Sequence, residues 1–204
     1  MAQSHFLYLM LSKTGTGMGK TIRFVTRYGY NHISLSLDPQ FLHWVSFARY
    51  VRGVPLAGGF VAESPERYLC LGQPVPVKIF RFEISEDRYQ KLSGLFDQAN
   101  RDDCGMVYNT LSALFTPVGI QFSIPGAYTC LQFANMVLGT SHRSIKALDS
   151  RHQSQLIFEG DLRRIVPDSG IRCDRYFIRR GPWGSTLDTP RHFARLCYRR
   201  SGCW

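Results

Sequence analysis

The chain has 204 residues, a formal net charge of +10 and an apolar content of 44%. This length fits one domain, or one domain with an extension, and the apolar content can build a core, which argues against a disordered chain. No stretch reaches the roughly 20 apolar residues that span a membrane. The apolar run at residues 6–11 lacks a basic leading region and a cleavage site, so we interpret it as a buried strand rather than a signal peptide and expect a cytoplasmic protein.

Positive charge is concentrated toward the C-terminus, where ten arginines lie from residue 163 to residue 200. Such a segment can bind nucleic acid or another anionic surface. It carries no nucleic-acid-binding motif and no basic helical pattern, so we favour a role in solubility over nucleic-acid binding. We expect one folded domain over residues 1–165 and a basic extension over residues 166–204, able to pack on that domain.

The six cysteines are candidates for disulfides, metal ligands or reactive thiols. Without an export signal, free thiols are expected. The chain has no CxxC pair, and no histidine lies at zinc-ligand spacing from a cysteine, so we predict neither a metal site nor a cofactor.

The first predicted strand, residues 6–11, leads into a Gly- and Thr-rich loop at 13–19 and a short helix at 20–26. The run TGTGMGKT within this segment resembles a phosphate-binding loop, which needs the pattern GxxxxGK[ST] so that successive amides wrap the phosphates. Here only three residues separate Gly15 from Gly19, one too few. We therefore interpret the run as a turn before a helix.

Residues 30–38 predict a second strand, because apolar and polar side chains alternate along it. The turn signal Asp38-Pro39-Gln40 follows, and residues 41–50 then return as a third strand, so the two strands form a hairpin. Residues 51–72 contain several Gly and Pro residues, predict irregular structure and would supply walls of a pocket.

A further strand is predicted at residues 75–84. A helix should begin at Ser85, where a capping residue and two acidic residues favour a helix start. A second helix is predicted at 108–115 and a loop at 123–128.

The helix with the clearest boundaries covers residues 130–138, because Thr129 caps its start and Gly139 ends it. The patterns after it are weaker, with one more strand predicted within residues 156–165. We find no internal repeat.

Cys130 at the start of this helix is the candidate nucleophile. A thiol attacks as thiolate, and a helix N-terminus and a neighbouring histidine both favour that anion. The same helix amides can hold the oxyanion of a tetrahedral intermediate. His32, on the polar face of its predicted strand, is the candidate base. Each residue also has a purely structural alternative: Cys130 as a small buried hydrophobe and His32 as a half-exposed strand residue.

Four segments, in this order along the chain, resemble the circularly permuted NlpC/P60 hydrolases, the YiiX-like and lecithin:retinol-acyltransferase-like branch of the papain-like superfamily. They are TRYGYNHIS at 26–34, WVSFAR at 44–49, GGFV at 58–61 and YTCLQFANMVL at 128–138. With TGTGMGKTIRFVT before them and FEGDL after them, the resemblance covers roughly residues 5–165.

The resemblance implies an α+β, permuted papain-like fold in which an antiparallel sheet packs against helices and the His strand precedes the Cys helix. It implies chemistry on amide, peptide or acyl-ester bonds through a thioester, with Cys130 as nucleophile and His32 as base. The family orients the imidazole with a third polar residue. We assign Ser46 to that role, because a turn centred on Pro39 would pair residues 32 and 46; His43 is the alternative.

A cysteine hydrolase or acyltransferase acting on small peptides, amides or acyl esters is thus the first hypothesis. The second is an inactive papain-like module that binds a partner through its Arg-rich tail. The third is a nucleotide-binding protein that uses residues 15–21.

Overall fold

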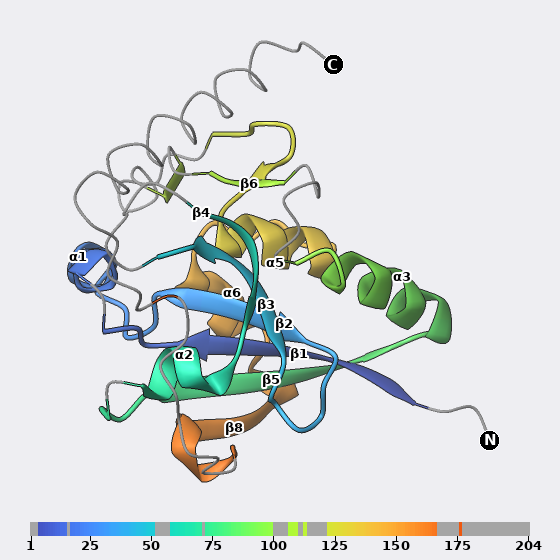
Figure 1. Ribbon diagram of the computed structural model, residues 1–204, viewed down its shortest axis with the longest axis horizontal. Helices are drawn as coiled ribbons and strands as arrows, with labels where there is room; N and C mark the ends of the chain where they lie inside the picture. Colours follow the sequence, from blue (N-terminus) through green and yellow to red (C-terminus); the bar gives the residue numbers. More distant parts are fainter. Residues whose placement is uncertain are drawn as a thin grey trace.

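The computed structural model of the chain describes residues 4–15, 17–51, 58–70, 72–99, 106–109, 112–113, 122–166 and 176. The described strands form a single eight-stranded sheet in the order β7-β6-β4-β3-β2-β1-β5-β8. Neighbouring strands are antiparallel, except that β6 and β7 are parallel. Several helices pack on this sheet, so the expected α+β class with a mainly antiparallel sheet is confirmed (Figure 1).

The strands are β1 (His5–Ser12), β2 (His32–Ser36), β3 (Trp44–Arg49), β4 (Gly58–Glu63), β5 (Pro76–Ile84), β6 (Val107–Tyr108), β7 (Ala127–Tyr128) and β8 (Leu156–Asp161). The α-helices are α1 (Gly17–Thr26), α2 (Pro65–Leu69), α3 (Glu86–Phe96), α5 (Cys130–Leu138) and α6 (Ile145–Arg151). Two short 3-10 turns follow, η2 (Gln153–Gln155) and η3 (Leu162–Arg164).

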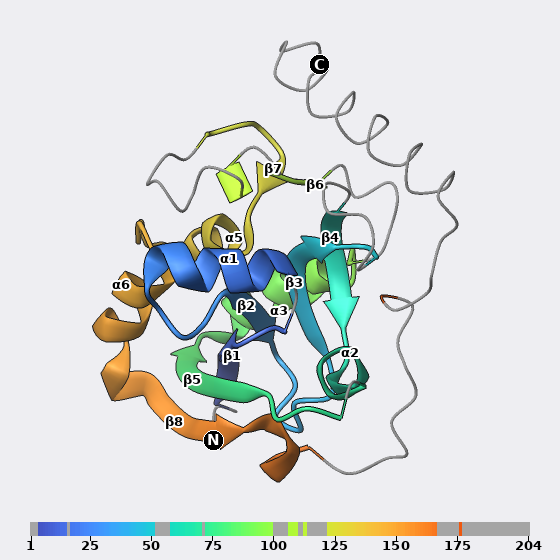
Figure 2. The ribbon, with the colours of Figure 1, turned by 90° about the vertical axis from the view of Figure 1, so that its left-hand side faces the viewer.

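The sheet buries both of its faces. Leu9 belongs to the core cluster that includes Phe133 of α5, whereas its neighbour Met10 belongs to the cluster that includes Leu69 of α2. Successive side chains of a strand point to opposite faces, so α5 and α2 lie on opposite sides of the sheet, and Figure 2 shows this arrangement. Helix α1 lies across one end of the central strands, where β1 ends and β2 begins (Figures 1 and 2).

The elements with strong periodicity or clear caps lie where the sequence predicts them. Strand β1, the β2–β3 hairpin and β5 match their predicted ranges to within a few residues. Helix α3 begins after Ser85, whose side chain accepts a hydrogen bond from the Arg88 amide. The predicted boundaries of α5 are confirmed, since Thr129 caps its first turn and Gly139 ends it with a φ of 68°.

The prediction of irregular structure at 51–72 is wrong for its second half, which holds β4 and α2. Gly58 and Gly59 are not loop residues here but allow β4 to lie close to β3 and to Tyr50, which follows β3. A Cβ at position 58 would lie 2.4 Å from the Ala48 carbonyl oxygen, and one at position 59 would lie 2.0 Å from the Tyr50 hydroxyl. The clash at position 58 is with backbone, so glycine there lets β4 pair with β3 along its whole length, whereas the Tyr50 side chain near position 59 could move.

Other differences are smaller. Helix α1 begins at Gly17 rather than at residue 20, and α6 has no counterpart among the predicted elements. Tyr108, predicted to start a helix, is the last residue of β6, and most of the remaining predicted helix at 108–115 lies outside the described residues. Cys130 is a free thiol, but Cys70 is disulfide-bonded, so the expectation of free thiols is wrong for Cys70.

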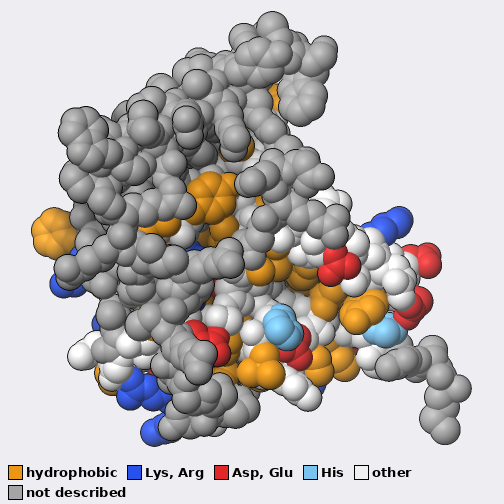
Figure 3. Space-filling model, viewed as in Figure 1, with side chains coloured by type: hydrophobic (Ala, Val, Ile, Leu, Met, Phe, Trp, Pro, Cys, Tyr) orange, Lys and Arg blue, Asp and Glu red, His pale blue; other side chains and the backbone are white. Residues whose placement is uncertain are grey.

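The predicted extension, residues 166–204, is described only at Val166 and Tyr176. None of the described helices combines the length and the apolar character that crossing a bilayer requires. Over the face shown in Figure 3, described side chains of both charges are interspersed among apolar ones.

Candidate active site

Cys130 is the first residue of α5. The helix start is held by a reciprocal cap, in which Thr129 Oγ1 accepts from the Gln132 amide at 3.2 Å and Gln132 Oε1 accepts from the Thr129 amide at 2.9 Å. The helix behind Cys130 is anchored in the core by Leu131 and Phe133. The capping box therefore fixes the direction in which the thiol points.

The amides of Cys130 and Leu131 remain available at this helix start. The first amides of a helix have no partner within the helix, and the Thr129 hydroxyl satisfies that of Gln132. Among the described residues, no hydrogen bond to the other two amides is present. Both residues line the same cavity. This pair of N–H groups is placed as an oxyanion site requires.

His32 is the first residue of β2 and bridges Cys130 and a buried carboxylate. Its Nε2 lies 3.2 Å from Glu63 Oε2 and 3.3 Å from Oε1. The Cys130 thiol also lies near this ring, close enough for the two groups to interact. Because Nε2 is engaged by Glu63, Nδ1 is the ring nitrogen that is left for the sulfur.

Glu63 is the last residue of β4 and is only 3% exposed. Its Oε1 forms an ion pair with Arg67 Nε at 3.1 Å. Its Oε2 accepts from Ser34 Oγ at 2.7 Å and from the Tyr68 hydroxyl at 2.6 Å. A buried charge with this many donors is fully compensated, so the carboxylate holds His32 from a fixed position.

The local sequence explains why these partners converge. Pro65 starts α2 directly after β4, which brings Arg67 to the position four residues beyond Glu63. Tyr68 follows and lies near His32, with ring centroids 6.5 Å apart and the rings tilted. The turn from β4 to α2 thus brings the side chains of Arg67 and Tyr68 back to the Glu63 carboxylate.

The opposite charges of His32 and Glu63 determine how the pKa of each group shifts. Burial by itself would lower the pKa of His32, but the negative charge of Glu63 and the hydrogen bonds to Cys130 and Glu63 outweigh it and raise this pKa to about 10. Burial would raise the pKa of Glu63, but the charges of His32 and Arg67 hold it well below its usual range. At neutral pH the arrangement favours an imidazolium between two acidic groups.

The expected pairing of residues 32 and 46 is wrong. Leu35 pairs with Val45, so the antiparallel register brings Ser34, not His32, opposite Ser46. The Ser46 hydroxyl is buried and has no hydrogen-bond partner in the described part of the chain. The alternative, His43, is exposed in the turn at the other end of the hairpin from His32. Neither side chain contacts the imidazole, and Glu63 occupies the position expected for the third residue.

Glu63 reaches His32 across a strand. In the sheet order, β3 lies between β4 and β2. Glu63 pairs with Trp44 of β3, so Ser46, two residues further along, faces the same side of the sheet. Over this face the carboxylate contacts His32 and Ser34 of β2.

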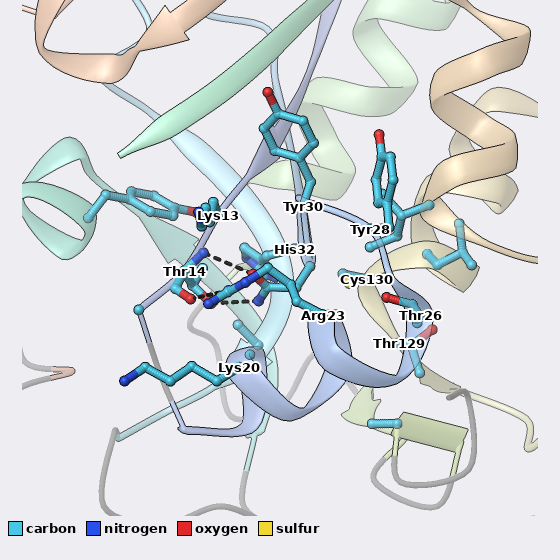
Figure 4. Close-up of a pocket in the computed structure, with 18 of the residues that line it drawn as sticks. Lys13, Thr14, Lys20, Arg23, Thr26, Tyr28, Tyr30, His32, Thr129 and Cys130 are labelled. Carbon is cyan, nitrogen blue, oxygen red and sulfur yellow. Dashed lines mark hydrogen bonds between the residues drawn. The ribbon is translucent and has the colours of Figure 1, made fainter. Parts of the chain in front are cut away.

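Cys130, His32 and Glu63 line a cavity of about 730 Å³ (Figure 4). Its walls come from α1 and the loop before it, from the first residues of β2, from the ends of β3 and β4, and from the start of α6. Tyr108 of β6 also lines it, and burial together with the nearby Cys130 raises the pKa of this phenol above its ordinary range. The volume suits a small organic substrate rather than a protein surface.

Tyr176 connects the C-terminal region with this cavity. Its ring lies 4.2 Å from the Arg67 guanidinium carbon, and its hydroxyl accepts from Arg49 Nη2 at 2.7 Å. Arg67 in turn donates to the Arg49 carbonyl at 2.6 Å. Tyr176 is buried and therefore packs against the side chain that holds Glu63.

The loop that resembled a phosphate-binding motif has another structural explanation. Helix α1 begins at Gly17, so the run leaves no long loop to wrap phosphates. A Cβ at Gly19 would lie 2.7 Å from the Asn31 amide nitrogen and 2.8 Å from Thr14 Oγ1. The glycine lets α1 pack closely against the segment that leads into His32.

No group of three or more potential ligands among the described residues could hold a metal ion. Comparisons of the chain with protein-family models, with curated proteins and with solved structures find no match. Membership of the permuted NlpC/P60 group therefore stays a prediction from short sequence motifs.

Proposed function

We propose that the chain is a cysteine hydrolase with a permuted papain-like, NlpC/P60-type fold that cleaves amide, peptide or acyl-ester bonds. Cys130 is the nucleophile, His32 transfers protons and Glu63 orients and charges His32. The observation that carries this proposal is the contact of one imidazole with both a helix-start thiol and a buried carboxylate. The order of the residues, base on a strand and nucleophile on a later helix, agrees with the family resemblance.

The reaction begins with Cys130 as thiolate beside the His32 imidazolium. The sulfur attacks the substrate carbonyl carbon, and the amides of Cys130 and Leu131 stabilise the resulting oxyanion. The intermediate collapses with cleavage of the C–N or C–O bond, and His32 donates its proton to the leaving amine or alcohol. A thioester on Cys130 remains.

Hydrolysis of the thioester uses His32 in its neutral form. It accepts a proton from water as the water attacks the thioester carbon, and the acid leaves while the thiolate is restored. Glu63 stays ionised throughout, because Arg67, Ser34 and Tyr68 hold it. Its charge favours the imidazolium with which the first step begins and which the second step restores.

The first test is trapping of the thioester. The chain is incubated with a panel of fluorogenic N-acyl amides and acyl esters, and intact mass spectrometry measures the acyl group on Cys130. We expect a hydroxylamine-sensitive adduct that is absent from Cys130→Ala, with a loss of kcat/KM of about 10³-fold or more in that variant.

Alkylation gives a control that needs no substrate. Iodoacetamide at pH 6 should modify Cys130 faster than the other reduced cysteines, and His32→Gln should abolish that preference. Equal rates for all thiols, with no acyl adduct from any substrate, would instead support the inactive binding module.

A further inference from the structure

The cavity carries a strong excess of positive charge. Among the described residues that line it, seven are lysines or arginines and one, Glu63, is a carboxylate. That carboxylate is already paired with His32 and Arg67. On the outer face in Figure 3, by contrast, described charges of both signs are interspersed. A ligand of opposite charge would neutralise this excess of positive charge in the cavity.

Arg23 is held in place at the wall of this cavity. Its Nη1 donates to the Thr14 carbonyl and to Asn31 Oδ1, both at 2.6 Å. Asn31 is itself fixed, because its amide group donates to Thr14 Oγ1 and accepts from the Thr14 amide. Figure 4 shows this cluster beside His32. Both acceptors of Arg23 Nη1 are neutral, so neither offsets the charge of the guanidinium.

One edge of the Arg23 guanidinium is uncommitted. Both protons of Nη1 are used by the two bonds above, whereas Nη2 and Nε make no hydrogen bond among the described residues. These two nitrogens form the planar pair of donors that matches the two oxygens of a carboxylate or phosphate. Arg23 is partly buried, and burial lowers its pKa from the ordinary value because it disfavours the charged form; a bound anion would offset this effect.

Two further cationic side chains lie in the same part of the cavity wall as Arg23. Lys13 and Lys20 line the cavity and form no ion pair within the described chain. Figure 4 shows both in the region of α1 and the loop before it, together with Arg23. Asn31, the partner of Arg23, directly precedes His32 in the chain. Arg23, His32 and Cys130 line the same cavity, so a group bound by Arg23 would share this cavity with the reacting atoms.

We infer that the substrate of this cavity carries an oxyanion group, a carboxylate or a phosphate, near the bond that is cleaved, and that Arg23 binds this group. The inference concerns the substrate of the hydrolase and so rests on the proposed function. Arg23 sets specificity, and Lys13 and Lys20 add attraction over a longer range.

A pair of alkylating reagents tests the anion site without turnover. Iodoacetate and iodoacetamide differ mainly by one negative charge, so the ratio of their rate constants at Cys130 measures the preference of the cavity for an anion. We expect Arg23→Gln to lower this ratio about three- to tenfold, and Lys20→Gln to lower it about twofold. Arg27→Gln, which removes the same charge from an exposed residue outside the cavity, is the matched control and should leave the ratio unchanged.

Two measurements on the unaltered chain keep the test independent of the folding of a variant. Raising NaCl from about 20 mM to about 500 mM should lower the iodoacetate rate and leave the iodoacetamide rate unchanged. Succinate should protect Cys130 from iodoacetamide, whereas succinamide should not. Protection by glycerol phosphate but not by succinate would identify the anion as phosphate, and the reverse result as carboxylate.

A ratio that is insensitive to both Arg23→Gln and salt, with no protection by either anion, would overturn the inference. That result is distinguishable from failure of the proposed function. A chain that forms a thioester with neutral substrates alone would retain the hydrolase but lose the anion site. A chain that shows the anion preference but forms no thioester would retain the anion site but lose the hydrolase.

Discussion

Two histidine sites in this molecule have opposite electrostatics. His32 lies against Glu63 and has a pKa raised to about 10. His142 and His152 lie 3.2 Å apart through their Nε2 atoms, and both have a lowered pKa. Burial lowers the pKa in all three cases, so burial does not distinguish the sites.

The difference lies in the neighbouring charge. Glu63 supplies a negative charge to His32. His142 and His152 instead lie near the positive charge of Arg151, and a hydrogen bond between His152 and Gln155 does not outweigh burial and this charge. The comparison teaches that a histidine with a polar partner is not by itself a proton-transfer site. His32 differs because its partner is a carboxylate that other donors hold in place, and this makes its imidazole a candidate catalytic base.

The largest effect is expected from Glu63→Gln, which removes the charge that distinguishes the two sites. The variant leaves Arg67 buried beside a neutral group, so the free energy of unfolding should fall by about 3–5 kcal/mol. The His32 pKa should fall toward or below 6.5, and kcat/KM should decrease by at least about 10²-fold. Chemical denaturation, NMR titration and kinetics measure the three quantities, with exposed Glu83→Gln as the control. An unchanged His32 pKa would contradict the assignment.

The pH dependence of the two sites should run in opposite directions. The folded pKa of His32 lies above its ordinary value of 6.5, so its contribution to stability is complete below pH 6.5 and is lost as the pH rises toward 10. For His142 and His152 the pKa is lowered, so their contribution is present above pH 6.5 and is lost as the pH falls. Histidine NMR titration should resolve one ring that titrates near pH 10 and two that titrate below 6.5. Three ordinary titrations would refute the comparison.

A smaller effect is expected from Tyr68→Phe, which removes one of the donors to Glu63 Oε2 and leaves Ser34 in place. Loss of one hydrogen bond to a buried charge should cost about 1.5–3 kcal/mol of stability. The alkaline limb of the pH–activity profile should move to lower pH, because a less well held carboxylate supports the imidazolium less. Tyr89→Phe, at a residue that packs against His5 on the far side of β1, should change neither quantity.

The smallest effect is expected from Ser46→Ala. The hydroxyl has no partner, so its removal should change the free energy of unfolding by less than about 0.5 kcal/mol or increase it slightly. Activity should stay within about twofold of the unaltered chain. A loss comparable to that of Glu63→Gln would restore Ser46 as the third residue and exclude the present arrangement.

The parts of the fold that depend on local signals could be predicted. Alternation marks β1 and the β2–β3 hairpin, and the caps at Ser85 and Thr129 mark the starts of α3 and α5. The two glycines of β4 gave the wrong prediction, because their role is a close approach to β3 that only the assembled sheet creates. A local pattern carries no information about such contacts.

The site divides in the same way. Cys130 and His32 could be proposed because each stands at a recognisable local position, a helix start and a strand, and because the segments around them resemble the permuted NlpC/P60 hydrolases. Glu63 could not, because its contact with His32 depends on the order of three strands and on the return of α2. The signal that was available is the run Glu63-Ser64-Pro65-Glu66-Arg67, a strand end, a capping residue and a helix-starting proline, with an acid and a base four residues apart.

Because the Glu63 side chain reaches over β3 to His32, the size of the side chain at position 46 is restricted. Position 46 faces the same side of the sheet as Glu63, so a small side chain there leaves room for the carboxylate to reach across β3. A leucine or phenylalanine would fill this room and displace the carboxylate. A residue with no chemical part in the reaction can thus be among the least replaceable in the molecule.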